Sequence, residues 1–94
     1  DTDKKYKNID SKILLEKVLA LVNDNKFIIS NIDVTILLQE PKLRNHIDSM
    51  RDILSKILNI EVSQISIKAT TTEGLGFVGR EEGIAAHCVC LIKQ

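Results

Sequence analysis

The residues best suited to chemistry lie together between Lys68 and Arg80, in the stretch KATTTEGLGFVGR. Three successive threonines can offer hydroxyl and backbone N–H donors to phosphate oxygens. Glu73 can hold a hard divalent cation, which prefers carboxylate and phosphate oxygens together, and Arg80 adds a positively charged fork. The composition is typical of a loop that binds a phosphorylated ligand. The competing interpretation is a surface turn whose glycines serve only left-handed backbone geometry.

Three glycines of this stretch, Gly74, Gly76 and Gly79, also match the G-x-G-x-x-G spacing of dinucleotide-binding proteins. That fingerprint requires a helix that begins at the glycines, inside a βαβ unit. Here Gly83 and a strand-like run follow instead. We therefore reject the dinucleotide-binding interpretation.

Two helices are predicted to support the loop, at residues 11–24 and 43–59, because apolar side chains recur there at intervals of three and four. The apolar face of the first helix consists of Leu14, Val18, Leu21 and Val22, widened by Ile13, Leu15 and Leu19. The apolar face of the second consists of Leu43, Ile47, Met50, Leu54, Ile57 and Leu58.

Three strands are predicted as well. Residues 26–39 alternate with a period of two, which indicates a long strand with one apolar side. A second strand is expected from about residue 64 to 70, and a third at residues 83–92. The third is apolar on both faces apart from His87, so we expect it to be covered on both sides.

The order helix, strand, helix, strand, strand predicts the α+β class: a two-layer sandwich with both helices on one face of a mixed sheet. Ninety-four residues make a single small domain, residues 1–94, and with 44% hydrophobic but only 3% aromatic residues its core must be aliphatic. The face of the sheet without helices then needs cover. In so small a chain, we expect another subunit to provide it.

Charge and hydropathy exclude other classes of partner. Thirteen basic and thirteen acidic residues cancel, without a basic cluster, so no nucleic acid is expected. No apolar run approaches the roughly 20 residues needed to span a bilayer, so no membrane is expected. Cys88 and Cys90 lie two apart on a predicted strand, where a disulfide between them would be strained. We expect both to be reduced, which favours a reducing compartment.

A family resemblance rests on the same stretch. Thr70-Thr71-Thr72-Glu73, followed by Gly74-Leu75-Gly76-Phe77-x-Gly79-Arg80-x-Glu82-Gly83-Ile84-Ala85, resembles the signature of the 2-C-methyl-D-erythritol 2,4-cyclodiphosphate synthases. Two more segments agree: Asp33-Val34-Thr35-Ile36 leading to Gln39-x-Pro41-Lys42, and the opening Asp1-Thr2-Asp3. The resemblance covers essentially all 94 residues, and implies that the chain is the C-terminal part of a synthase whose family members begin well upstream of Asp1.

The resemblance implies a phosphorus–oxygen lyase of non-mevalonate isoprenoid biosynthesis. Such an enzyme converts 4-diphosphocytidyl-2-C-methyl-D-erythritol 2-phosphate into 2-C-methyl-D-erythritol 2,4-cyclodiphosphate and releases CMP by metal-assisted intramolecular phosphoryl transfer. It also implies a homotrimer whose sheets face the three-fold axis and whose active sites lie between subunits. The compartment would be a bacterial cytoplasm or a plastid-type stroma.

The resemblance also implies the substrate-binding segments. Asp1, Thr2 and Asp3 correspond to part of the pocket for the phosphate and methylerythritol groups. The loop that receives the cytosine ring corresponds to Leu38, Gln39, Glu40, Pro41, Lys42, Leu43 and Arg44, with Lys42 near the phosphates.

In the same way, Thr70, Thr71, Thr72 and Glu73 would hold the diphosphate. Thr71, Thr72 and Glu73 are the predicted catalytic residues, and Glu73 is the predicted ligand of magnesium or manganese. Phe77 and Arg80 match positions at the trimer axis, where an isoprenoid-type diphosphate can bind.

The sequence departs from the family in two ways. His87 stands where many relatives carry a glutamate that faces the cavity on the trimer axis. A histidine there would make the charge of this cavity responsive to pH near neutrality. The essential zinc of the family is held by residues upstream of Asp1, and nothing in this chain forms a three-ligand set to replace them. We therefore expect the 94-residue chain alone to lack zinc and to be inactive.

Two alternatives remain open. One is a non-enzymatic module that binds a nucleotide or an isoprenoid diphosphate, and the other is a purely structural oligomerisation domain. A need for zinc and the release of CMP separate the enzyme from the binding module. The structural domain predicts no affinity for cytidine nucleotides.

Overall fold

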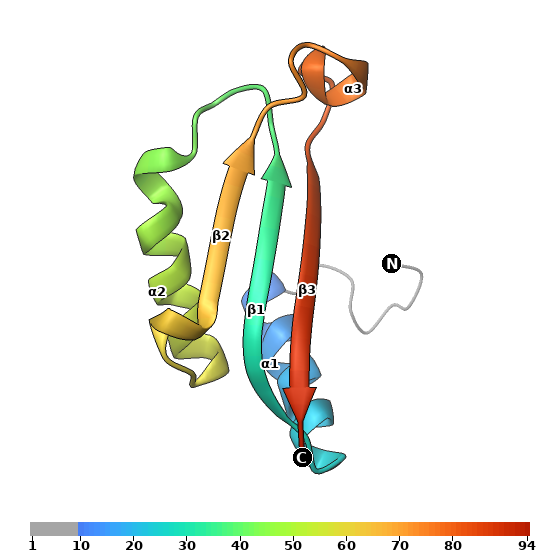
Figure 1. Cartoon of the computed structure of the whole chain (residues 1–94). Helices are drawn as coiled ribbons and strands as arrows, with labels where there is room; N and C mark the ends of the chain where they lie inside the picture. The colour runs from blue at the N-terminus through green and yellow to red at the C-terminus, as the bar shows by residue number, and fades with distance from the viewer. Residues whose placement is uncertain (1–9) are drawn as a thin grey trace.

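The computed structural model describes residues 10–94 (Figure 1). The helices are α1 (Ser11–Asp24), α2 (Ile47–Leu58) and the short α3 (Gly76–Gly79), and the strands are β1 (Ile28–Leu37), β2 (Ile65–Thr70) and β3 (Ala85–Lys93). Two 3₁₀ turns, Arg44–His46 and Val62–Gln64, precede α2 and β2. The predicted order of two long helices and three strands is confirmed.

The sheet is mixed and has the strand order β2-β1-β3. β1 runs parallel to β2, with Ile32 opposite Ile65 and Leu37 opposite Thr70, and antiparallel to β3. The carboxyl-terminal ends of β1 and β2 therefore lie at the same end of the sheet, where β3 begins (Figure 1). Within the described residues, all segments predicted to bind ligand leave the sheet at this end.

The core lies between α2 and the sheet. Its buried residues are Ile36, Ile65 and Ile67, and the partly buried side chains around them are Val34, Leu38, Leu43, Ile47, Met50, Leu54 and Ile60. α1 packs beside α2. The predicted α+β class, with helices packed on a mixed three-stranded sheet, is confirmed, and so is the aliphatic character of the core.

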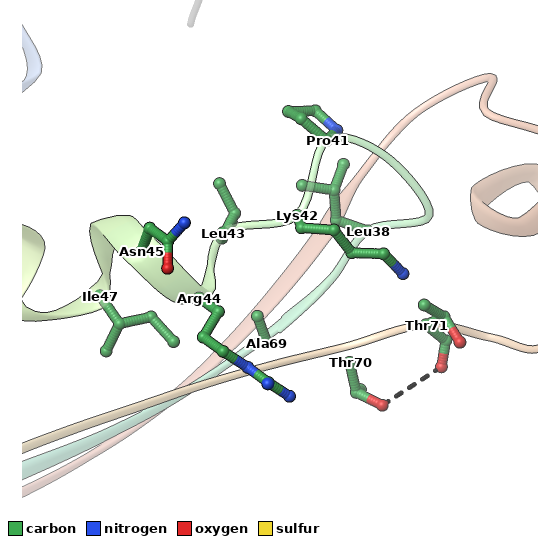
Figure 2. Close-up of a pocket in the computed structure, with 10 residues that line it drawn as sticks. All are labelled: Leu38, Pro41, Lys42, Leu43, Arg44, Asn45, Ile47, Ala69, Thr70 and Thr71. Atoms are coloured by element: carbon green, nitrogen blue, oxygen red, sulfur yellow. Dashed lines mark hydrogen bonds between the residues drawn. The ribbon is translucent and has the colours of Figure 1, made fainter.

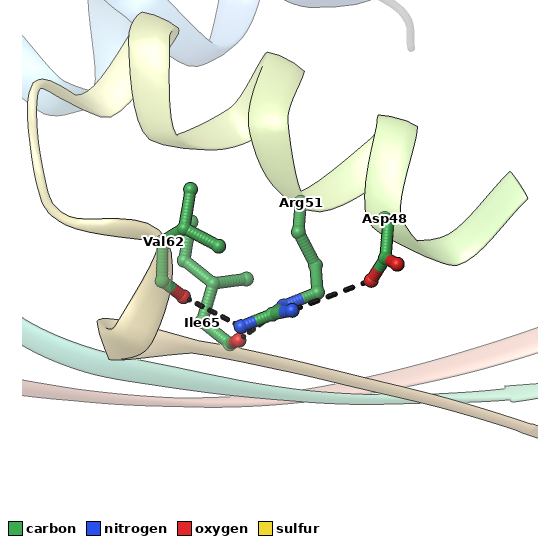
Figure 3. A network of polar contacts seen from close by, with 4 residues as sticks. All are labelled: Asp48, Arg51, Val62 and Ile65. Atoms are coloured by element: carbon green, nitrogen blue, oxygen red, sulfur yellow. Dashed lines mark hydrogen bonds and ion pairs between the residues drawn. The ribbon is translucent and has the colours of Figure 1, made fainter.

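Arg51 joins α2 to β2 (Figure 3). Its Nε donates to the Ile65 carbonyl at 2.9 Å, its Nη2 donates to the Val62 carbonyl at 3.0 Å, and its Nη1 lies 3.4 Å from Oδ1 of Asp48. These bonds fix the helix over the start of β2. At its other end α2 stops at Asn59, which has a φ of 54° and so adopts the left-handed conformation that ends many helices.

The second face of the sheet, here called the open face, carries alternate residues of each strand. On this face β1 carries Asn31, Asp33 and Thr35. The ammonium of Lys68 on β2 pairs with the Asp33 carboxylate. β3 contributes Val89 and Leu91, which are 71% and 57% exposed.

The prediction that the third strand is covered on both sides is wrong for the described single chain. Cys88 and Cys90, on the face of β3 opposite to Val89, are exposed as well. The reason is positional: β3 is an edge strand, and α2 packs over β2 at the opposite edge of the sheet.

The observed boundaries of the elements differ from the predicted ones by a few residues. The strand predicted at residues 26–39 is confined to Ile28–Leu37, and the second helix begins with a 3₁₀ turn instead of at Leu43. The apolar face of α1 is rotated, since Val18 and Leu21 are exposed while Leu15 and Leu19 are partly buried. Within residues 10–94, no helix combines the length and the apolarity needed to cross a membrane.

Candidate binding and active site

The site is organised by the parallel ends of β1 and β2. Leu37 and Thr70 are the last paired residues, and the Leu38 N–H donates to the Thr70 carbonyl at 3.0 Å, one step beyond the strands. Residues 38–44 and the threonine motif thus leave the sheet side by side. Two segments that the sequence could only predict separately are joined by this bond.

A pocket of about 590 Å³ lies between these two segments (Figure 2). It is lined by Leu38, Pro41, Lys42, Leu43, Arg44, Asn45, Ile47, Ala69, Thr70 and Thr71. Figure 2 shows the Lys42 and Arg44 side chains extending toward the side where Thr70 and Thr71 lie. Five predicted residues of the cytosine loop and two of the phosphate motif are therefore brought together here.

The chemistry of the lining suits an anion attached to a flat apolar ring. Lys42 and Arg44 are cations, no carboxylate from residues 10–94 lines the pocket, and Thr70 and Thr71 add hydroxyls. Leu38, Pro41 and Leu43 supply an apolar wall. Phosphate oxygens can accept charge-assisted hydrogen bonds from the cations, while a ring packs on the wall.

Two predicted residues of the loop lie outside this lining. Glu40 is exposed and Gln39 is half-buried. The side-chain carbonyl oxygen of Gln39 is buried, with no hydrogen-bond partner among the described residues. Asn45, Ile47 and Ala69 also line the pocket but were not predicted as site residues. Ala69 lies within the stretch singled out for its chemistry, and Ile47 lies on the predicted apolar face of the second helix, where it indicated packing. Asn45 gave no signal.

Beyond the pocket the chain turns sharply at Glu73. Its φ is 58°, and its N–H donates to Thr71 Oγ1 at 3.3 Å. The carboxylate is exposed, and it takes part in none of the ion pairs formed among residues 10–94. An exposed carboxylate that pairs with no cation among residues 10–94 is suited to hold magnesium or manganese.

Phe77 and Arg80 lie farther along, on and just after α3, and do not line the pocket. Phe77 is 51% exposed, and Nε of Arg80 donates to Oε1 of Glu82 at 2.8 Å. The expectation that no helix begins at the glycines is wrong, since α3 starts at Gly76. The dinucleotide-binding interpretation stays rejected, because β3 runs antiparallel to β1 and no βαβ unit includes these glycines.

The described residues do not form a zinc site. Among residues 10–94, no three His, Cys, Asp or Glu side chains come together in a way that could hold a metal ion. Cys88 and Cys90 are free thiols. Partial desolvation of its sulfur, and then the neighbouring Cys88, raise the pKa of Cys90, which favours the neutral thiol over the metal-binding thiolate. Asp1, Thr2 and Asp3 lie outside the described residues.

Comparison with solved structures finds the same fold in cyclodiphosphate synthases. The bifunctional IspDF from Campylobacter jejuni superposes with a TM-score of 0.89 at 38% identity, over 98% of this chain and 25% of that one. The CDP complex of IspF from Plasmodium falciparum superposes with a TM-score of 0.82 at 32% identity, over 93% of this chain and 54% of that one.

Comparison of sequences points to the same group of enzymes as the comparison of structures. The 2-C-methyl-D-erythritol 2,4-cyclodiphosphate synthase of Francisella tularensis subsp. tularensis (strain WY96-3418) is 56% identical over all 94 residues, which span 59% of that relative's length. The model of the YgbB family matches residues 1–93. The chain therefore belongs to the YgbB family, and its predicted resemblance to the cyclodiphosphate synthases is confirmed.

Proposed function

We propose that this chain supplies the cytidine- and diphosphate-binding part of a cyclodiphosphate synthase. The substrate is 4-diphosphocytidyl-2-C-methyl-D-erythritol 2-phosphate, and the products are 2-C-methyl-D-erythritol 2,4-cyclodiphosphate and CMP. One observation carries the proposal: the parallel pairing of β1 and β2 places residues 38–44 beside Thr70 and Thr71 around one pocket with two cations. The names of the similar proteins, including a complex with CDP, support it.

In the proposed reaction an oxygen of the 2-phosphate attacks the β-phosphorus of the same molecule's diphosphate. The bond from the β-phosphorus to the bridging oxygen breaks, and CMP leaves with that oxygen and its electron pair. No protein nucleophile is needed. The task of the protein is to hold the attacking and leaving oxygens in line and to neutralise the developing charge.

Each part of the site has a role in this proposal. Leu38, Pro41 and Leu43 pack against the cytosine ring, with Gln39 and Glu40 completing the loop by main-chain contacts. Lys42 and Arg44 attract the phosphates, and the hydroxyl groups of Thr70 and Thr71, together with N–H groups of the motif Thr70–Glu73, orient the diphosphate. Asp1, Thr2 and Asp3 would complete the methylerythritol side.

Glu73 would hold magnesium or manganese between its carboxylate and the phosphate oxygens. When bound, such an ion supplies charge neutralisation at the phosphoryl group. Zinc ligands are not assigned within residues 10–94, which contain no suitable set. Because residues of this chain line the pocket, we expect it to bind nucleotide by itself. The chain spans 59% of the relative's length, and we expect turnover to require the enzyme at full length.

The open face supports the proposal of a homotrimer, with active sites between subunits. Val89 and Leu91 leave apolar surface on it that a second and third copy would cover. Phe77 and Arg80, outside the pocket, would then lie at the three-fold axis and could hold an isoprenoid diphosphate. The bacterial relatives support a bacterial cytoplasm as the compartment.

Titration calorimetry with CMP in magnesium buffer tests the proposal, with AMP as the comparison ligand. We expect CMP to bind selectively, and Lys42→Ala to weaken it about tenfold, since one charge-assisted bond contributes about 1.5 kcal/mol. Lys56→Ala is the matched control. Its Nζ lies 3.0 Å from Oδ2 of Asp52 on the outer side of α2, so CMP affinity should not change.

Equal binding of CMP and AMP, or no binding by a folded sample, would contradict the cytidine assignment. The second candidate is the non-enzymatic binding module, for which the same pocket would suffice. It predicts CMP affinity without catalysis. Assaying CMP release from the diphosphocytidyl substrate, in the enzyme at its full natural length, separates the two.

A further inference from the structure

The hydroxyl of Thr72 is already engaged within the protein. Thr72 Oγ1 donates to the Leu75 carbonyl at 2.7 Å, and the Leu75 N–H donates back to the Thr72 carbonyl at 3.1 Å. A threonine hydroxyl has one proton to donate. The Thr72 hydroxyl therefore closes a turn, here called the Thr72–Leu75 turn, and has no proton left for a phosphate oxygen.

The turn is braced from behind by α3. A β-carbon added at Gly79 would lie 2.1 Å from the carbonyl carbon of Gly74. The two backbones therefore pack so closely that position 79 has no room for any side chain. The Gly79 N–H also donates to the Leu75 carbonyl at 3.1 Å. Leu75 thus accepts bonds from both Thr72 and Gly79, and the turn has little freedom to move away from α3.

Glu73 is the residue that this turn constrains. It has a φ of 58°, a conformation that is uncommon for a residue with a long side chain and persists only where the surroundings enforce it. Gly74 follows with a φ of 80°. The closing bond of Thr72 and the contact between Gly74 and Gly79 lie on either side of the Glu73 main chain and supply that enforcement.

We propose that Thr72 is a positioning residue that acts through Glu73, with Gly79 as its support. The turn that they hold fixes the direction of the Glu73 carboxylate relative to Thr70 and Thr71, where the diphosphate is proposed to bind. Thr72 needs no contact with the ligand for this role. The inference rests on the proposed function, since it assigns one residue's part in the same site.

The test compares two ligands that differ by the β-phosphate. CDP affinity is measured with Mn²⁺ and with EDTA, and CMP affinity is measured as a check that the pocket is intact. In the wild-type chain we expect Mn²⁺ to strengthen CDP binding. Thr72→Val keeps the shape but removes the hydroxyl, and should lower the Mn²⁺-dependent gain about tenfold, as loss of a residue that orients a metal ligand does.

Rescue and matched variants separate positioning from a loss of fold. Thr72→Ser should restore the Mn²⁺-dependent gain in CDP affinity, and Glu73→Gln should abolish it. Gly79→Ala should behave like Thr72→Val. Gly83→Ala is its control, because there an added carbon meets only the edge of the Phe77 ring at 3.3 Å and the gain should persist.

The outcomes that overturn the two proposals differ. A Thr72→Val chain with the full Mn²⁺-dependent gain overturns the positioning role alone, as does a loss of CMP affinity equal to the loss of CDP affinity. A wild-type chain that binds neither CMP nor CDP overturns the proposed function and the positioning role with it.

Discussion

The α2–β2 layer, residues 47–67, and the site loop, residues 71–83, keep their shapes by different means. In the α2–β2 layer the side chains determine the structure: Ile65 is 2% exposed, Leu58 is 4% exposed, and Arg51 bonds to two main-chain carbonyls. In the site loop most side chains are exposed, and main-chain bonds together with left-handed residues set the path. The stability of the fold and the path of the Glu73 main chain therefore depend on different interactions. Substitutions should therefore separate them.

The largest effect on stability is expected from Ile65→Ala. The change removes a buried side chain from the centre of the core and leaves a cavity, so unfolding in urea should cost about 3 kcal/mol less. Leu75→Ala in the site loop is the matched truncation. Leu75 is 73% exposed, and its loss should change the free energy of unfolding by less than about 0.5 kcal/mol. Equal losses in the two variants would contradict the division between the regions.

A smaller loss is expected from Arg51→Met. The variant keeps much of the aliphatic stem but leaves the carbonyls of Val62 and Ile65 without their side-chain donor, which should cost about 2 kcal/mol. Lys56→Met, on the same helix, breaks only an exposed ion pair with Asp52 and should cost about 0.5 kcal/mol or less. Thermal or urea unfolding of the two proteins side by side checks the contrast, which fails if Lys56 proves as important as Arg51.

The smallest effect, with the opposite sign, is expected from Glu73→Gly. Glycine adopts a positive φ without steric cost, so the variant removes the strain of the left-handed conformation from the folded state. This gain should exceed the cost of the added conformational entropy of the unfolded chain, so the free energy of unfolding should rise by about 0.5 kcal/mol. The same variant should lose the Mn²⁺-dependent gain in CDP affinity. A variant that is more stable and no longer binds Mn²⁺ would show that Glu73 serves binding and not the stability of the fold. A loss of stability would show instead that the Glu73 side chain supports the loop.

The sequence predicted the layers because their signals are periodic. Alternation along β1, and the spacing of three and four along α2, each define one apolar side. In the structure both sides contribute to one core, which includes Ile36 from that strand and Met50 and Leu54 from that helix. α1 was less determinate. Apolar residues at positions 13–15, 18, 19, 21 and 22 form so broad a stripe that its orientation depends on the neighbouring helix.

The site residues were predicted from a motif, and their arrangement in space was not. The resemblance predicted the threonine motif and the Lys42 loop as binding segments, whereas Ala69 lines the pocket because the parallel register pairs it with Ile36, and Asn45 because it lies in the 3₁₀ turn before α2. The exposure of β3 likewise depends on the order of the strands in the sheet, which contacts between distant segments decide. Local propensity carries no information about such contacts.

The parallel pairing of β1 with β2 also bears on the order in which the molecule folds. α2 and its preceding turn can form from local contacts, whereas Leu37 meets Thr70 only after the whole intervening segment has crossed over the sheet. We therefore expect the pocket between residues 38–45 and 69–71 to be among the last features to appear during folding and the first to be lost during unfolding. A nucleotide that binds only the finished pocket would slow unfolding and act as a late check on correct assembly of the sheet.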